Sequence, residues 1–361
     1  MSIEKLLKKI QQAKDEQLPF VIYRKPESDE VKVLIQKNQR LDYSDDFKSS
    51  GFVLAPFDTS KQAVVFEENN LEIFHCDISK ELLADAYIFQ KQPQITRDPD
   101  DQLQHMQLVQ KGIDEIRKGS FVKAVLSRSE SYIIKEVDVT AVFLRLMRKY
   151  PSAFVYVWYH PAIGIWSGAS PELLLRTEGK NFQTMSLAGT QKYSGSVDVS
   201  WGEKEIKEQR IVTDHIVESL QGMPLELSDL YTRKAGDLLH LCNDIKGQLG
   251  VNTSLHELIE KLHPTAAICG LPKKEVRQFI LREEGYDRSY YTGFLGELNM
   301  NDGKESRSNL FVNLRCMQLI ERPNPQAIIY VGGGITLGSN PLLEWKETVD
   351  KSLIMKSVLE S

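Results

Sequence analysis

Two short segments place acidic side chains at helical spacing, and both offer the oxygen ligands that a hard cation takes. In the segment SNPLLEWKETVDK near the C-terminus, Glu344, Glu347 and Lys351 are three and four residues apart and share one face of a helix. The segment GEKEIKEQRIV repeats this spacing with Glu205 and Glu208. Two helices that each present a carboxylate pair could converge on Mg²⁺. The alternative is two solvated helix faces, because charged runs usually face water.

An amine and a carboxyl group in apolar segments could supply acid–base chemistry. Lys123 lies within FVKAVLSRSE, where it either extends its ammonium to solvent or is a desolvated amine suited to base catalysis. Glu172 follows a Gly-Ala-Ser-Pro turn in IWSGASPELLLR, close to Trp166 and several leucines. Apolar surroundings would raise its pKa and make it a general acid; the alternative is a solvated glutamate at a sheet edge.

Three further segments carry weaker signals. SLAGT (186–190) ends a strand with backbone N–H groups and a hydroxyl that could hold a carboxylate, or it is a plain turn. GGGITLG lacks both the dinucleotide fingerprint and the Lys-Ser/Thr of a phosphate-binding loop. The seven histidines show no metal-ligand spacing, and His263, before a proline turn, is expected to be structural.

Composition excludes several classes of protein. The 361 residues carry a formal net charge of −5 and are 41% hydrophobic, which is typical of globular proteins. No apolar run approaches the roughly 20 residues of a membrane span, and the slight acidity argues against nucleic acid as a partner. The four cysteines lack close pairing, which favours the reducing cytoplasm over a disulfide framework.

The elements that must position these residues alternate between hairpin-linked strands and long helices. Residues 1–100 are expected to form one helix and several short strands, and residues 101–361 contain every segment with candidate chemistry. No low-complexity linker marks a boundary, and one compact domain is expected overall. The strand segment NLFVNLRCMQLI and the segment AIIYVGGGIT are each expected to be one strand. The pattern predicts an α+β fold with large, mostly antiparallel sheets covered by helices. Helices are expected before Gly119, over 139–149, 202–221, 253–262 and 273–284, and after Asn340.

The order of the segments resembles the family of chorismate-utilising enzymes, which includes isochorismate synthases, anthranilate synthase component I, aminodeoxychorismate synthase and salicylate synthases. The resemblance extends from about Gly119 to the C-terminus and implies two antiparallel sheets packed together, with helices outside and a central cleft. It is carried by KAVLSR, GASPELLLR, SLAGT, EIKEQ, HPTAAICGLPK, YYTGFLGEL, VNLR and GGGITLGSNPLLEWKET.

The resemblance implies a role for each matching residue. Glu208 and Glu347 would bind Mg²⁺ directly, with Glu205 and Glu344 behind them, and the metal would hold the ring carboxylate of chorismate. Lys123 would be the base that activates water, and Glu172 the general acid. The enolpyruvyl carboxylate would be held by Gly189, Thr190, Arg315, Gly332 and Lys351. The sequence departs from the family at Gln209, where a histidine usually follows the metal-binding glutamate.

Three positions distinguish the branches of the family. Lys123 favours water as the nucleophile, because ammonia-using anthranilate synthases resemble this segment but carry glutamine there. Ala188 replaces the lysine common in aminodeoxychorismate synthases, and Ala267 replaces a threonine usual in ammonia-using and salicylate-forming members. The resemblance therefore implies a Mg²⁺-dependent isochorismate synthase with no glutamine amidotransferase subunit, serving menaquinone, siderophore or salicylate production. The alternatives are a salicylate synthase, an ammonia-dependent aminating enzyme and a non-catalytic chorismate-binding protein.

Overall fold

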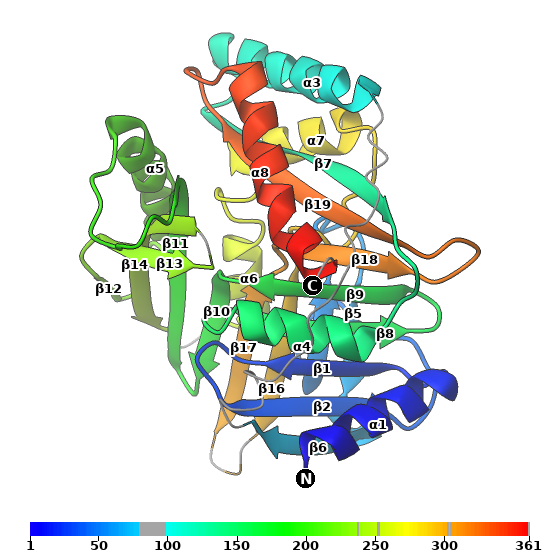
Figure 1. Cartoon of the computed structure of the whole chain (residues 1–361). Coiled ribbons are helices and arrows are strands. Elements are labelled where there is room, and N and C mark those ends of the chain that lie inside the picture. The colour runs from blue at the N-terminus through cyan, green and yellow to red at the C-terminus, as the bar shows by residue number, and fades with distance from the viewer. Residues whose placement is uncertain (79–98, 237, 251–252, 302, 304, 360–361) are drawn as a thin grey trace.

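Antiparallel strands form two large sheets in the computed structural model (Figure 1). The structure describes all residues except 79–98, 237, 251–252, 302, 304 and 360–361. Within this part, one sheet has nine strands, in the order β15 (Gly270–Leu271), β7 (Lys123–Ile133), β19 (Gln326–Ile335), β18 (Cys316–Ile320), β9 (Gly164–Ser170), β8 (Phe154–His160), β1 (Phe20–Arg24), β2 (Glu30–Gln36) and β6 (Leu71–Asp77). The other runs β12 (Leu225–Leu227), β14 (Leu238–Gln248), β11 (Asn181–Lys192), β10 (Leu173–Glu178), β17 (Ser306–Val312), β16 (Phe294–Asn301), β4 (Gly51–Ala55), β5 (Ala63–Glu67) and β3 (Asp42–Ser44), with β13 (Tyr231–Ala235) paired to β14.

The two sheets share an apolar core that is rich in aromatic rings. Trp158 and Trp166 of the nine-stranded sheet are fully buried in the same cluster as Phe52 and Phe311 of the other sheet. The ring of Phe154 stacks on that of Phe311 at a centroid distance of 4.3 Å. Burial of these large side chains supplies the main attraction between the sheets, because each removes a large apolar area from water.

Helices cover the outer faces of both sheets, as the sequence predicts. The first helix buries one apolar stripe that includes Leu6 and Ile10. The helices α1, α4 and α8 contribute to one outer cluster with the nine-stranded sheet, whereas α5 and α6 pack on the ten-stranded sheet. The bounds are α1 Ile3–Asp15, α3 Pro99–Arg117, α4 Val139–Lys149, α5 Glu203–Ser219, α6 Leu255–Leu262, α7 Lys273–Glu283 and α8 Pro341–Leu359. None of these helices is both long and apolar enough to cross a membrane.

The predicted α+β architecture of two large antiparallel sheets with helices outside is confirmed. Strands from the first 100 residues lie in both sheets, since β1, β2 and β6 extend one and β3, β4 and β5 extend the other. The several short strands expected in residues 1–100 are β1 to β6.

Two of the places where the chain crosses from one sheet to the other lie next to each other and at predicted site residues. Strand β9 passes into β10 through Pro171 and Glu172, and β17 passes into β18 through residues 313–315. The prediction of one continuous strand over NLFVNLRCMQLI is therefore wrong. Arg315 adopts a φ of +47°, a left-handed conformation that ends the extended run and turns the chain toward the second sheet. These crossings place Glu172 and Arg315 between the sheets.

Candidate active site

One cavity gathers the residues that the sequence analysis singled out. Its volume is about 170 Å³. The walls come from β7, β11, β14, β19, α5, α8 and the two crossings between the sheets. Eleven of the twelve predicted site residues line it: Lys123, Glu172, Gly189, Thr190, Glu205, Glu208, Ala267, Arg315, Gly332, Glu347 and Lys351. Glu344 is the exception; its side chain is buried beside the cavity and does not line it.

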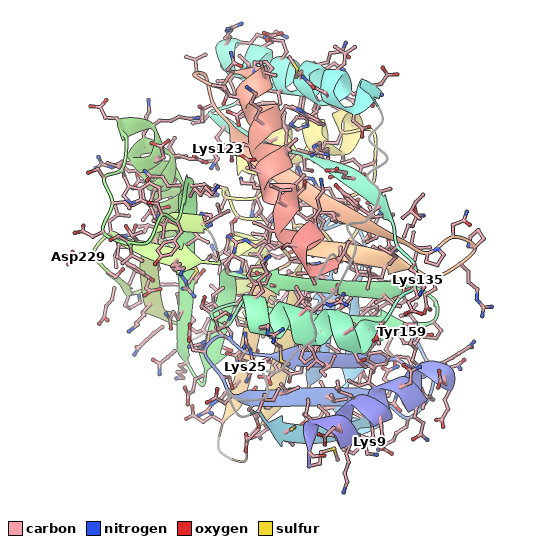
Figure 2. All side chains as sticks on the ribbon, in the orientation of Figure 1. Lys9, Lys25, Lys123, Lys135, Tyr159 and Asp229 are labelled. Atoms are coloured by element: carbon pink, nitrogen blue, oxygen red, sulfur yellow. The ribbon has the colours of Figure 1, made fainter. Side chains whose placement is uncertain are left out.

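Lys123 is a buried amine, so of the two alternatives that the sequence left open the extension of its ammonium to solvent is excluded. Its exposed fraction is 1%, whereas its apolar neighbour Val122 is 55% exposed. The short strand β15 pairs with β7 at this point, with Leu271 opposite Lys123, and covers the sheet edge. The ammonium lies between α8 and α5 (Figure 2), and its Nζ is 2.8 Å from Glu208 Oε1. Strand register therefore directs this side chain into the cavity although its neighbours are apolar.

Glu172 is a buried carboxyl group that stays protonated near neutral pH. Its exposed fraction is 3%. The backbone carbonyl of Glu172 accepts a hydrogen bond of 3.0 Å from the backbone N–H of Val312, at the crossing between β17 and β18. Burial raises its pKa to about 8, although the nearby Lys123 and the Thr265 hydroxyl lower it. An ordinary glutamate would be ionised at pH 7, so this burial creates a proton donor.

The carboxylates of α5 and α8 approach the glycines of β19 from two sides. A Cβ atom on Gly334 would lie 2.5 Å from Glu208 Oε1, and one on Gly333 would lie 3.4 Å from Glu344 Oε2 and 3.9 Å from Glu347 Oε1. A Cβ atom at Gly334 would displace the Glu208 carboxylate, whereas one at Gly333 would meet its carboxylates at van der Waals distance. The absence of a side chain at Gly334 therefore lets Glu208 approach β19 closely.

Neighbouring charges and burial shift the pKa values of Glu347 and Glu344 in this cluster. The Glu347 carboxylate is 2.7 Å from Lys351 Nζ, and that ammonium lowers the pKa of Glu347. Burial raises the pKa of Glu344, and the adjacent Glu347 charge raises it further. Glu205 lines the same cavity, and its Oε2 lies close to Gly202 at the start of its own helix, since a Cβ atom on Gly202 would be 2.6 Å away.

These carboxylates have the chemistry of a hard-cation site. Mg²⁺ takes oxygen ligands and commonly uses only one or two carboxylates with water and substrate. In the described residues, no three His, Cys, Asp or Glu side chains are already grouped as metal ligands. Glu208 and Glu347 instead contact lysine ammonium groups. The donor set and the glycine approach fit Mg²⁺, with part of its coordination left to water or substrate.

Other groups that line the cavity suit an organic carboxylate. Arg315 Nη1 donates to Ala235 O at 2.9 Å, and its Nη2 is 2.9 Å from His240 Nε2. Lys351 Nζ also donates to Gly332 O at 3.1 Å. A fixed guanidinium with an ammonium in the same cavity is a typical carboxylate clamp.

His240 is a site residue that the sequence analysis missed. Burial and the neighbouring Arg315 lower its pKa to about 3, so the ring is neutral. Its Nδ1 is 2.9 Å from Gly189 O and therefore carries the proton, which leaves Nε2 to accept from Arg315. A lone histidine between leucines in LLHLCN resembles a core residue, and no local signal marked it.

Gln209, which replaces the usual histidine, faces away from the cavity. It is 1% exposed, and its amide nitrogen donates to Ser186 O at 3.1 Å and to Asn243 Oδ1 at 3.2 Å. The amide thus attaches α5 to β11 and β14. Its position does not disturb Glu208, one residue earlier.

Comparisons with known proteins agree with this arrangement. The sequence model of a family described as chorismate binding enzyme matches residues 59–360. Isochorismate synthase MenF of Pasteurella multocida is 26% identical over 325 residues, which cover 87% of this chain and 74% of that protein. Isochorismate synthase EntC of Escherichia coli K12 is 31% identical over 248 residues, which cover 65% of this chain and 62% of that protein. The chain therefore spans less than two thirds of some relatives that it matches.

Solved structures show the same fold. The menaquinone-specific isochorismate synthase MenF of Escherichia coli superimposes with a TM-score of 0.78 at 22% identity, over 94% of this chain and 88% of that chain. Anthranilate synthase component I of Streptococcus pneumoniae superimposes with a TM-score of 0.67 at 16% identity, over 94% of this chain and 92% of that chain. At these identities the likeness shows the architecture alone.

Proposed function

This chain belongs to the family of chorismate-binding enzymes, and we propose that it is an isochorismate synthase that interconverts chorismate and isochorismate with Mg²⁺. The observation that carries the proposal is the pair of buried groups in one cavity, an amine at Lys123 and a carboxyl group at Glu172. Relatives named isochorismate synthase, at 26% and 31% identity, support the choice of reaction. The two buried groups match the two proton transfers that this reaction needs.

In the proposed mechanism, Lys123 acts as the base in its neutral form. Its amine takes a proton from a water molecule, whose oxygen forms a bond to C2 of the ring. The two ring double bonds shift, and the bond between C4 and its hydroxyl breaks. Glu172 donates its proton to the departing hydroxyl, which leaves as water. Each proton transfer typically contributes about 10²–10⁴-fold to the rate.

Glu208 and Glu347 are the residues that would hold Mg²⁺, with Glu344 and Glu205 adjacent. When bound, the ion would hold the ring carboxylate of chorismate and stabilise negative charge there. In the structure, Glu208 contacts the Lys123 ammonium.

The clamp formed by Arg315 and Lys351 would orient the enolpyruvyl group. Arg315 and Lys351 supply positive charge, and Gly189, Thr190 and Gly332 supply backbone or hydroxyl groups close by. His240 holds the Arg315 guanidinium through Nε2, so it acts as a positioning residue. Holding both carboxylates of the substrate would align C2 with Lys123 and C4 with Glu172.

Three small features favour water over ammonia and isomerisation over pyruvate loss. Lys123 is the water-activating residue in the family resemblance, and Ala188 and Ala267 present methyl groups to the cavity where other branches carry lysine or threonine.

The four cysteines are buried free thiols, which fits our proposal that the reaction takes place in the cytoplasm. The isochorismate that the enzyme forms would serve menaquinone or siderophore biosynthesis. The reaction uses water in place of ammonia, so no amidotransferase subunit is needed.

The isotopic origin of the new hydroxyl tests the proposed mechanism. In H₂¹⁸O, isochorismate formed by the enzyme should carry ¹⁸O at C2, since the oxygen comes from solvent. Lys123→Ala should abolish turnover with substrate binding largely retained, whereas Lys135→Ala, at an exposed lysine, should behave as the wild type. Unlabelled product, or near-normal turnover by Lys123→Ala, would contradict the mechanism.

A further inference from the structure

The face that helix α8 turns toward the sheet is largely polar. Four polar residues at intervals of four are buried on this face, each no more than 3% exposed: Glu344, Thr348, Ser352 and Lys356. The helix also buries Met355 and Val358 near its end, while Leu343 and Leu353 are exposed. Residues four apart share one face, and a surface helix normally buries an apolar stripe. Burial of apolar surface therefore does not explain how α8 is held.

Strand β7 contacts this polar face beside the carboxylates that would hold Mg²⁺. Arg128 Nε donates to the Thr348 hydroxyl at 2.9 Å, and the guanidinium carbon of Arg128 lies 4.3 Å from the centroid of the Trp345 ring. Thr348 directly follows Glu347, and Trp345 directly follows Glu344. Arg128 therefore fixes α8 at the two residues that adjoin its acidic pair.

A second buried contact fixes the later part of the helix. The Lys356 ammonium is 2.9 Å from Glu130 Oε1, and the same carboxylate is 3.1 Å from Arg128 Nη1 and accepts the Tyr132 hydroxyl. Arg128, Glu130 and Tyr132 alternate along β7 and so lie on one face of it. The strand that carries the proposed base Lys123 thus also holds the helix that carries the metal-site glutamates.

Stability alone does not account for these polar contacts. A buried ion pair loses the hydration of both charges, and apolar residues of similar volume often stabilise a fold equally well or better. Apolar contacts are non-directional, whereas a hydrogen bond requires a narrow range of lengths and angles. Polar contacts at both ends of a helix therefore confine it to one rotation and one position along its axis.

The functional groups of α8 need this precision. The helix lies over β7 and β19 (Figure 1), and Lys351 Nζ donates to Gly332 O of β19 at 3.1 Å. Glu347 must meet Glu208, which comes from a different helix, α5. Mg²⁺ demands near-ideal octahedral geometry with ligands at about 2.0–2.1 Å. A small rotation or shift of α8 would separate the two carboxylates that the ion requires.

We propose that Arg128 and Glu130 of β7, through Thr348 and Lys356 of α8, are positioning residues that place the Glu347 carboxylate for Mg²⁺. These four residues do not line the active-site cavity, so they act through the helix and not on the substrate. Their role rests on the proposed function, since it requires that Mg²⁺ is held by this cluster.

Three variants of α8 separate positioning from simple loss of a hydroxyl. Thr348→Val keeps the shape of the side chain and removes both the bond to Arg128 and a bond of 2.8 Å to Trp345 O. Ser352→Ala is the matched control, because Ser352 Oγ donates to Val349 O at 2.8 Å within the same helix. Thr348→Ser keeps the hydroxyl and is the conservative variant that should restore the wild-type behaviour.

Mn²⁺ is the probe, because Mn²⁺ and Mg²⁺ both prefer octahedral oxygen sites. Binding would be followed through the EPR signal of the free ion, without chorismate and with chorismate at equilibrium, so that a site completed by the substrate is also measured. Thr348→Val should raise the dissociation constant about three- to tenfold, as the loss of one hydrogen bond requires. Thr348→Ser and Ser352→Ala should bind Mn²⁺ like the wild type.

Turnover adds a second readout. The kcat of Thr348→Val at saturating Mg²⁺ and chorismate should change less than the Mg²⁺ concentration for half-maximal rate, because Lys123 and Glu172 are not carried by α8. An unchanged Mn²⁺ dissociation constant in Thr348→Val, or an equal rise in Ser352→Ala, would overturn the positioning role. The wild type would still bind Mn²⁺ and convert chorismate in that case, so the proposed function would stand. A wild type that neither binds Mn²⁺ nor converts chorismate would overturn both.

Discussion

Replacement of Glu172 by glutamine should remove the general acid and with it a specific part of the pH profile. Glutamine preserves the shape of the side chain but cannot donate the proton that the leaving hydroxyl needs. Because a general acid contributes about 10²–10⁴-fold, we expect kcat to fall by that factor. Glu178→Gln is the matched control, since Glu178 is an exposed glutamate at the far end of β10.

The pKa of Glu172 fixes where the pH profile should bend. With a pKa of about 8, about nine tenths of this carboxyl is protonated at pH 7 and about one tenth at pH 9. A glutamate at its ordinary value of 4.5 would be only about 0.3% protonated at pH 7. Burial therefore increases the reactive form about 300-fold. The wild-type kcat/KM, which reports groups of the free enzyme, should fall on the alkaline side of about pH 8, by roughly tenfold between pH 7 and pH 9.

Steady-state kinetics with chorismate and Mg²⁺ between pH 6 and pH 9.5 would measure both effects. The residual activity of Glu172→Gln should lack the alkaline decline, because the group that titrates has been removed. A kcat near that of the wild type would refute the assignment. A decline that persists unchanged in the variant would show that another group controls the profile.

Three further outcomes follow from the same geometry. In chemical denaturation, the free energy of unfolding of the wild type should fall as the pH rises from about 4.5 to 8, because folded Glu172 keeps a proton that the unfolded chain releases. The free energy of unfolding of Glu172→Gln should fall less over the same range. Equal falls in the wild type and the variant would contradict this. His240→Phe removes a partner of the active-site guanidinium and should raise KM for chorismate about tenfold with a smaller effect on kcat; an unchanged KM would rule out the positioning role. Gly334→Ala puts a Cβ atom 2.5 Å from Glu208 Oε1 and should raise the Mg²⁺ concentration needed for half-maximal rate at least several-fold. Gly338→Ala, at a glycine with open space around it, should leave that concentration unchanged. Equal Mg²⁺ dependence in both variants would exclude crowding of the Glu208 carboxylate.

Local patterns predicted the helices and most of the strands of this fold. Helical spacing and capping residues act over a few residues, and α4 and α6 begin at Asp138 and Ser254, whose side chains accept hydrogen bonds from the first turn. The break at Arg315 could not be read in the same way. Strand-forming residues lie on both sides of Arg315, and only the packing of two sheets decides that the chain changes sheet there.

The site residues that belong to motifs in a recognisable order along the chain were predictable. The residues whose role depends on contacts between distant parts of the chain were not. The family resemblance identified Lys123 and Glu172 as site residues. Their neighbours in the sequence did not indicate whether these two side chains are buried or exposed. Burial is decided by strand register and by β15 at the edge, both of which depend on residues distant in the sequence. His240 remained undetected because its role arises from contacts with Gly189 and Arg315, far apart along the chain.

Product analysis by NMR tests the central claim most directly. The purified protein would be incubated with chorismate, with and without Mg²⁺, and with and without ammonium. The account predicts a Mg²⁺-dependent equilibrium mixture of chorismate and isochorismate that does not change with ammonium. Salicylate and pyruvate, an aminated product, or chorismate left unaltered in the presence of Mg²⁺ would each contradict it.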